Sequence, residues 1–122
     1  MAHSPDSSLH LIADLDHCRG LGDIALIETS LREAAQAARA TLLDVRLHHF
    51  GPGMGVTGVA LLAESHISIH TWPEHGIAAV DLFVCGREAD AEAGLETICR
   101  HLQGKVRRKQ AVRRLGLENP TA

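Results

Sequence analysis

The densest run of chemically reactive side chains lies between residues 64 and 74 and reads ESHISIHTWPE. Its β-branched content favours a strand, on which His66, Ser68 and His70 would share one face because side chains alternate. As a helix, the run would space His66 and His70 like a zinc-binding pair, but it lacks an H-E-x-x-H pattern. We therefore expect hydroxyl and imidazole chemistry on a strand and no metal site. Taken alone, His70 could equally be a structural, hydrogen-bonded histidine.

The chain contains three cysteines, Cys18, Cys85 and Cys99, which form neither a C-x-x-C pair nor an even set for disulfides. This usage predicts reduced thiols and a cytoplasmic protein. No apolar run has the length of a signal sequence or of a membrane span, so we expect no membrane association. By itself, Cys85 would be interpreted as a small buried residue at the end of a strand.

The elements that must position these residues fit a single domain over residues 1–122. Alternating and β-branched patterns predict a first strand that starts at Leu9. They predict further strands over residues 41–50, 56–62, 65–70 and 78–84, with a loop at 51–55. Asp23 and Asp90 can cap two helices, the second of which we expect Gly104 to stop. Residues 106–117 could form a last strand or an arm. We expect 1–8 and 118–122 to be frayed tails without function.

This order of elements predicts an α+β fold, a two-layer sandwich of a mostly antiparallel sheet with both helices on one face. The other face of the sheet must be covered by something. A second copy of the same chain would cover it most simply, so we expect a homodimer.

Six of the 12 Lys and Arg residues lie between positions 105 and 114, although the formal net charge of the chain is −3. Such a stretch could bind nucleic acid or an anionic substrate, or it could be a solvated basic surface. No aromatic residue lies among these charges, which favours the solvated surface. We therefore expect no nucleic-acid partner.

Residues 64–86, ESHISIHTWPEHGIAAVDLFVCG, closely resemble the processing and active-site region of prokaryotic S-adenosylmethionine decarboxylase proenzymes. The family pattern is approximately E-S-H-x-x-I-H-T-W-P-E-x-G-x-A-x-x-D-x-F-x-C-G. Weaker similarity includes His49, Phe50 and residues 55–58, and the resemblance covers about residues 9–104 in all.

The resemblance implies that the chain cleaves itself between Glu64 and Ser65. The Ser65 hydroxyl would attack the Glu64 carbonyl, and β-elimination from the resulting ester would leave a pyruvoyl group derived from Ser65. The products would be a β chain of residues 1–64 and an α chain of residues 65–122. His70 matches the processing histidine, and Thr57 stands where many members have a serine that hydrogen-bonds the processing site.

The resemblance also implies the chemistry of the mature enzyme. The pyruvoyl carbonyl would form a Schiff base with the substrate amino group and accept the electron pair released with CO2. Cys85 matches the residue that then protonates the substrate α-carbon. Phe50 and Trp72 match positions near the substrate, and Glu74 is placed to accept hydrogen bonds from ribose hydroxyls. The product is the aminopropyl donor for spermidine synthesis, and the family builds its sites from both subunits of a dimer.

Two alternatives remain at this point. At Leu15, His75 and Ile77 the family often carries aromatic rings, so the substrate could instead be arginine or ornithine. An acid such as Asp14, Asp16 or Glu74 would then meet the distal cation. A non-catalytic module that binds a small molecule is the more distant alternative, and it would have no need to cut itself.

Overall fold

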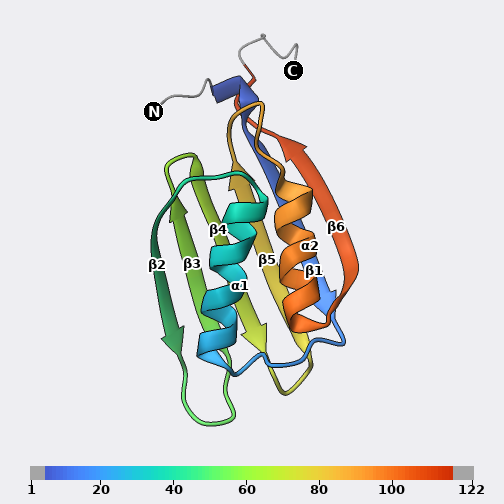
Figure 1. Cartoon of the computed structure of the whole chain (residues 1–122). Coiled ribbons are helices and arrows are strands. Elements are labelled where there is room, and N and C mark those ends of the chain that lie inside the picture. The colour runs from blue at the N-terminus through green and yellow to red at the C-terminus, as the bar shows by residue number, and fades with distance from the viewer. Residues whose placement is uncertain (1–4, 117–122) are drawn as a thin grey trace.

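The computed structural model describes residues 5–116, which fold into two layers, a sheet and a pair of helices (Figure 1). After a short 3-10 turn, the chain runs through β1 (Leu9–Asp16), α1 (Ile24–Ala37), β2 (Leu42–His49), β3 (Val56–Leu62), β4 (Ser65–Trp72), β5 (Ile77–Val84), α2 (Ala91–Leu102) and β6 (Lys105–Arg113). The strand order across the sheet is β2-β3-β4-β5-β1-β6. Every neighbouring pair is antiparallel, and the predicted α+β sandwich is confirmed.

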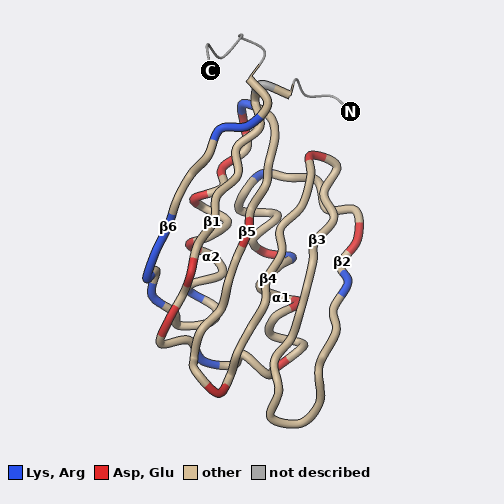
Figure 2. The backbone as a smooth tube through the Cα atoms, turned by 180° about the vertical axis from the view of Figure 1, so that it is seen from behind, with Lys and Arg blue, Asp and Glu red and all other residues tan. Residues whose placement is uncertain are grey.

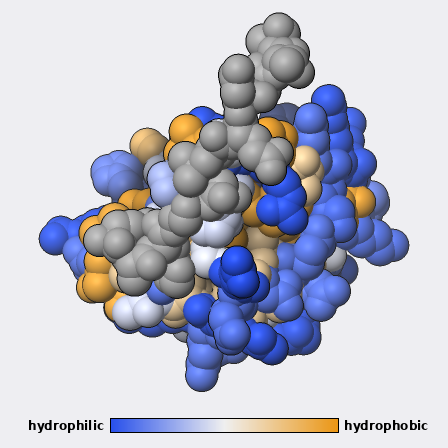
Figure 3. All heavy atoms as spheres, turned by 90° about the horizontal axis from the view of Figure 1, so that it is seen from above, coloured by the Kyte–Doolittle hydropathy of each residue, from blue (hydrophilic) through white to orange (hydrophobic). Residues whose placement is uncertain are grey.

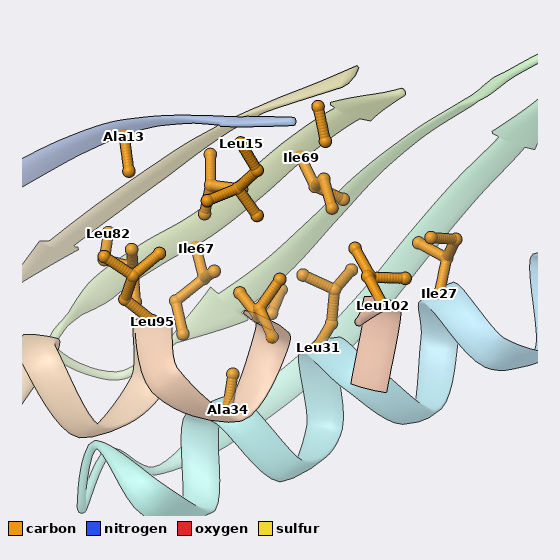
Figure 4. Close-up of a cluster of buried hydrophobic side chains, with 14 of the residues drawn as sticks. Ala13, Leu15, Ile27, Leu31, Ala34, Ile67, Ile69, Leu82, Leu95 and Leu102 are labelled. Carbon is orange, nitrogen blue, oxygen red and sulfur yellow. The ribbon is translucent and has the colours of Figure 1, made fainter. Parts of the chain in front are cut away.

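The two helices lie side by side on one face of the sheet, α1 over β2 and β3 and α2 over β5 and β1. Asp23 caps α1 by accepting a hydrogen bond from the Leu26 N–H at 3.2 Å, and Asp90 caps α2 through the Ala93 N–H at 3.0 Å. Both predicted caps are therefore present. Apolar side chains from the strands and helices meet between the layers (Figure 4), where Ile67, Ile69 and Leu82 are fully buried.

Three expectations need correction or completion. Helix α2 ends at Leu102, and the residue that takes the left-handed conformation behind it is Gln103 (φ 53°) rather than Gly104. The segment 105–113 is a strand at the edge of the sheet, not an arm. Of the tail expected at 1–8, residues 5–8 are not frayed, because Ser7 and Ser8 bind the end of β5. Residues 1–4 and the tail expected at 118–122 lie outside the described residues.

The face of the sheet opposite the helices is open in the single chain (Figure 2). On β4, Ile67, Ile69 and Thr71 point into the core, whereas residues 66, 68, 70 and 72 lie on the open face. The predicted grouping of His66, Ser68 and His70 is thus confirmed. No helix within residues 5–116 combines the length and apolar character that a membrane span requires.

The basic residues of β6 follow the outer edge of this face (Figure 2). Seen from the end of the sheet at which β1 starts and β6 ends, hydrophilic residues cover most of the side that β6 forms, and hydrophobic residues reach the surface on the opposite side (Figure 3). Lys and Arg on an exposed edge strand oppose pairing with a further strand. This placement is consistent with the solvated basic surface expected from the sequence.

Gly55 lets the loop between β2 and β3 close against β4. A Cβ atom at this position would overlap with the carbonyl oxygen of Thr71. We expect Gly55→Ala to lower the free energy of unfolding by about 1–3 kcal/mol, since backbone has to move. Gly116→Ala is the matched control, because its Cβ would meet nothing within 4 Å. Urea unfolding of both variants measures the difference, and equal stabilities would contradict the close packing at Gly55.

Candidate active site

The junction between Glu64 and Ser65 lies in the tight turn that joins β3 to β4. Leu62 and Ser65 are paired across the hairpin, so Ala63 and Glu64 form the two-residue connection. Ser65 has a φ of 151°, a backbone conformation that a residue with a side chain rarely adopts. A tight bend is therefore present at this junction, and it places a strained serine directly after the candidate scissile bond.

The Glu64 side chain is anchored to the start of β2. Its Oε1 atom accepts a hydrogen bond from the Thr41 N–H at 2.8 Å, and its Oε2 atom accepts one from the Thr41 hydroxyl at 3.1 Å. The turn is held a second time by the Ala63 N–H, which donates to the Thr41 carbonyl at 2.9 Å. Thr41 thus restrains the Glu64 side of the junction.

A histidine and an aromatic cluster lie on the Ser65 side of the junction. The Ser65 hydroxyl is 3.3 Å from Nδ1 of His66. The His66 ring meets the Phe83 ring edge-on, with centroids 5.9 Å apart. On Phe83, the His10 ring stacks at 5.2 Å, and the Arg114 guanidinium lies 5.3 Å from the centroid. These groups come from β4, β5, β1 and the segment after β6.

Cys85 follows the last residue of β5 at the same end of the sheet. The register pairs His66 with Phe83, so residue 65 lies across from Val84, directly before Cys85. The thiol is buried (7% exposed), and its sulfur is 3.1 Å from the Ser8 hydroxyl. The next residue is held as well, since the Gly86 N–H donates to the Ser7 hydroxyl at 3.0 Å. The candidate proton donor is therefore a positioned, buried thiol beside the candidate cleavage site.

The other predicted site residues form a second cluster on the open face. The Thr57 hydroxyl is 3.1 Å from Nδ1 of His70, which lies opposite it in the register of β3 and β4. Both residues line a pocket of about 280 Å³ that Phe50, Trp72 and Glu74 also line. The structure thus brings together the two residues predicted to support processing and the three predicted to bind substrate.

The two clusters are separated along β4. Ser65 and His70 are five residues apart, about 17 Å on an extended strand with a rise of roughly 3.3 Å per residue. Within one chain, His70 therefore cannot reach the Ser65 hydroxyl or its α-hydrogen. The candidate site of a single chain is split into a cleavage end and a pocket end.

Sequence reasoning missed the roles of three residues, Ser8, Thr41 and His66. Ser8 lies 77 residues from Cys85, and no local pattern predicts that β1 pairs with β5. The contact of Thr41 with Glu64 could have been predicted. If the strands on either side of the loop at 51–55 form a hairpin, the start of β2 lies beside the end of β3. Alternation along the strand predicts the face on which His66 lies but not its contact with the Ser65 hydroxyl.

The other two cysteines differ from Cys85 in their surroundings. Burial, with the nearby Cys99 and Asp16 as smaller causes, raises the pKa of the Cys18 thiol from 9.0 to about 11. Burial also raises the pKa of Cys99. Both thiols lie near the end of α2, away from the Glu64–Ser65 junction. Across residues 5–116, no three His, Cys, Asp or Glu side chains gather into a possible metal site.

Comparison with known proteins identifies the family. The model of the family described as S-adenosylmethionine decarboxylase matches residues 9–115. This chain belongs to the S-adenosylmethionine decarboxylase family. It is 47% identical over 109 residues to the S-adenosylmethionine decarboxylase proenzyme of Prochlorococcus marinus (strain MIT 9313), which covers 89% of this chain and 83% of that protein.

Relatives from distant organisms agree with this assignment. The S-adenosylmethionine decarboxylase proenzyme of Methanococcus aeolicus is 50% identical to this chain over 91 residues, which cover 73% of this chain and 77% of that protein. The crystal structure of the adenosylmethionine decarboxylase from Aquifex aeolicus superposes with a TM-score of 0.82 at 36% identity, covering 98% of this chain and 99% of that one. The comparisons favour neither the arginine or ornithine alternative nor the binding module.

The raised pKa of Cys18 predicts slow alkylation. At pH 8, a thiol of pKa 9.0 is roughly one tenth thiolate, whereas one of about 11 is roughly one thousandth thiolate. We expect iodoacetamide to label Cys18 about 100-fold more slowly in the folded protein than in guanidinium at the same pH. Peptide mass spectrometry after timed labelling gives both rates, and equal rates would mean that burial does not protect this thiol.

Proposed function

We propose that this chain is a self-cleaving S-adenosylmethionine decarboxylase with a pyruvoyl group derived from Ser65. Cleavage would divide it into a β chain of residues 1–64 and an α chain of residues 65–122. The observation that carries this proposal is the Glu64–Ser65 junction, where a strained serine (φ 151°) follows a carboxylate held by Thr41. Strain and restraint together favour attack by the hydroxyl on the adjoining carbonyl.

The residues around position 65 fit a pyruvoyl group. It would lie at the start of β4, across from the end of β5 and beside a buried thiol. When formed, the group supplies a carbonyl that condenses with the substrate amino group and accepts the electron pair released with CO2. Cys85 would then give its thiol proton to the substrate α-carbon, and the Ser8 hydroxyl 3.1 Å away would hold that thiol in place.

His70 and Thr57 would act during self-cleavage. We assign to His70 the removal of the Ser65 α-hydrogen in the elimination step, because an imidazole exchanges protons near neutral pH. Thr57 contacts Nδ1 of His70 at 3.1 Å and would orient the ring. The same pocket would hold the substrate, with Phe50 and Trp72 against the adenine and sulfonium groups and Glu74 on the ribose hydroxyls.

The split between the two clusters supports a homodimer of processed protomers. If two chains pack through their open faces about a two-fold axis that crosses β4 near Ser68, Ser65 of one copy faces His70 of the other. Ile12, Leu61 and Trp72 on this face are 40%, 51% and 43% exposed in the single chain, and the second copy would cover apolar surface of this kind. Each complete site would then contain the cleavage end of one copy and the pocket end of the other.

The proposed cellular role follows from the proposed reaction. The relatives are named for the decarboxylation of S-adenosylmethionine. The product of that reaction here would be the aminopropyl donor for spermidine synthesis. We place the enzyme in the cytoplasm, in agreement with three cysteines that form no disulfide among the described residues. The partner it needs besides its second copy is a small-molecule substrate.

Self-cleavage can be tested directly on the purified protein. We expect intact mass spectrometry to find fragments 1–64 and 65–122, the second of which begins with a pyruvoyl group and resists Edman sequencing. Ser65→Ala removes the hydroxyl nucleophile and should give one uncut chain, while Ser68→Ala on the same strand should cleave. If the wild-type protein stays uncut and contains no carbonyl that reacts with hydrazines, the proposal is wrong and the binding module is favoured.

Cys85 should be needed for decarboxylation but not for self-cleavage. We expect Cys85→Ala to cleave normally and to lose most decarboxylation, about 100-fold or more, because elimination at Ser65 needs no donor at the substrate α-carbon. Release of labelled CO2 from S-adenosylmethionine, arginine and ornithine in parallel measures this loss and identifies the substrate. Cys99→Ala is the control. Full activity of Cys85→Ala would assign the proton to another group, and release from arginine or ornithine alone would change the substrate.

The shared site predicts complementation between two inactive variants. Alone, Ser65→Ala and His70→Ala should each stay uncut. When the two chains are refolded together, the His70→Ala chain should be cleaved, because its intact Ser65 meets an intact His70 from the other chain. Mixing His70→Ala with the double variant Ser65→Ala, His70→Ala is the control. Absence of cleavage in a confirmed heterodimer would mean that the site is not shared.

A further inference from the structure

His66 has no part in the reaction described so far, although it is the titratable side chain in direct contact with the Ser65 hydroxyl. Its Nδ1 atom is 3.3 Å from Ser65 Oγ, a separation that catalytic pairs often have before the reaction tightens them. His70 is five residues further along the strand and acts, in the proposal above, on a hydrogen of a different atom. The hydroxyl proton therefore needs an acceptor of its own.

The surroundings of His66 hold its ring in place. Phe83 lies opposite it in the register and meets its ring edge-on at 5.9 Å. Phe83 is in turn held by the His10 ring and by Arg114, whose Nη1 atom is 3.3 Å from Nδ1 of His10. Arg114 thus contacts Phe83 and His10, and Nδ1 of His66 contacts the Ser65 hydroxyl.

The charged groups near His66 come from several strands. Leu61 lies opposite it on β3, and the register continues to Asp44 on β2, where Asp44 is paired with Arg46 at 2.9 Å. On the other side are Phe83, then His10 on β1, and Arg114. The nearest carboxylate in sequence, Glu64, accepts its hydrogen bonds from Thr41. Within residues 5–116, His66 forms no ion pair with a carboxylate, and its Nδ1 atom faces the Ser65 hydroxyl.

We infer that His66 is the general base for the first step of self-cleavage, an inference that rests on the proposed function. In the tautomer that carries its hydrogen on Nε2, Nδ1 accepts the proton of the Ser65 hydroxyl. Oγ bonds to the carbonyl carbon of Glu64, and the bond from that carbon to the Ser65 nitrogen breaks. The proton passes from His66 to the departing nitrogen. The products are an ester and a free amino group, with no change of oxidation state.

This assignment gives the two histidines of β4 successive tasks. His66 serves the acyl shift within its own chain, and His70 of the second copy serves the elimination that follows. A block at the first step leaves an amide, whereas a block at the second leaves an ester. Hydroxylamine distinguishes the two, because it cuts an ester under conditions that spare an amide.

The test compares His66→Asn with the wild type and with His17→Asn. Asparagine keeps an acceptor close to the position of Nδ1 but cannot take up a proton. His17 is the matched control, since its side chain is 74% exposed and it lies in the left-handed region (φ 57°) that asparagine tolerates. Intact mass spectrometry of freshly refolded proenzyme gives the first-order rate constant of cleavage between pH 5 and 9, and circular dichroism verifies the fold.

We expect His66→Asn to cleave about 100-fold or more slowly than the wild type, in the range usual for loss of a general base. The wild-type rate should depend on pH, because a general base acts only in its unprotonated form, and this dependence should be absent in the variant. The uncut variant should resist hydroxylamine, whereas uncut His70→Ala should be cut by it. Added imidazole should restore part of the rate.

Two results would overturn the inference while leaving the proposed function intact. One is cleavage of His66→Asn at the wild-type rate. The other is a slower rate with the wild-type pH profile, which would make His66 merely structural. Should His66→Asn fail to fold, His66→Gln undergoes the same measurements with the same criteria. If the wild type itself remains uncut, the proposed function fails and this inference fails with it.

Discussion

The candidate site depends on the way β4 is locked into the sheet. Ile67 and Ile69 are fully buried against the helices, and Thr71 donates a hydrogen bond to the Leu21 carbonyl at 2.7 Å. Because side chains alternate along a strand, this buried side determines that the reactive residues of β4 lie on the open face. A slip of one residue would bury the reactive residues and expose the isoleucines, so the packing of the core also sets the chemistry.

The same strand carries two groups that cannot meet within one chain. The hairpin to β3 places Ser65 at one end, and the pocket with Thr57 and His70 lies about 17 Å away at the rise of an extended strand. A rigid strand cannot shorten this distance. In the proposed homodimer, a two-fold pairing of open faces would solve the problem, because it would reverse the direction of β4 in the second copy and would also cover the apolar residues of this face.

The cleavage end is assembled from segments far apart in the sequence. Thr41 restrains Glu64, Ser8 contacts Cys85, and Arg114 lies over Phe83. Each contact joins the start or the end of a strand to a neighbouring strand of the sheet. The central strands thus carry the reactive groups, and the ends of β1, β2 and β6 hold them in place.

The sequence alone determined the local features. Alternation and helix caps predicted the first five strands, both helices and the face that His66, Ser68 and His70 share, but left the last strand open. The run at 64–86 identified the family and the candidate residues. These features depend on neighbours within a few positions, which is why a pattern can predict them.

Only the tertiary structure decided which distant segments meet. The pairing of β1 with β5 and β6 puts Ser8 on Cys85 and Arg114 on Phe83, and nothing local in residues 5–8 distinguishes them from a tail. The left-handed conformation at Gln103 and the separation of Ser65 from His70 likewise follow from packing and strand geometry. The pairing of distant strands depends on the apolar surface that the whole sheet buries, and no short stretch of sequence determines that burial.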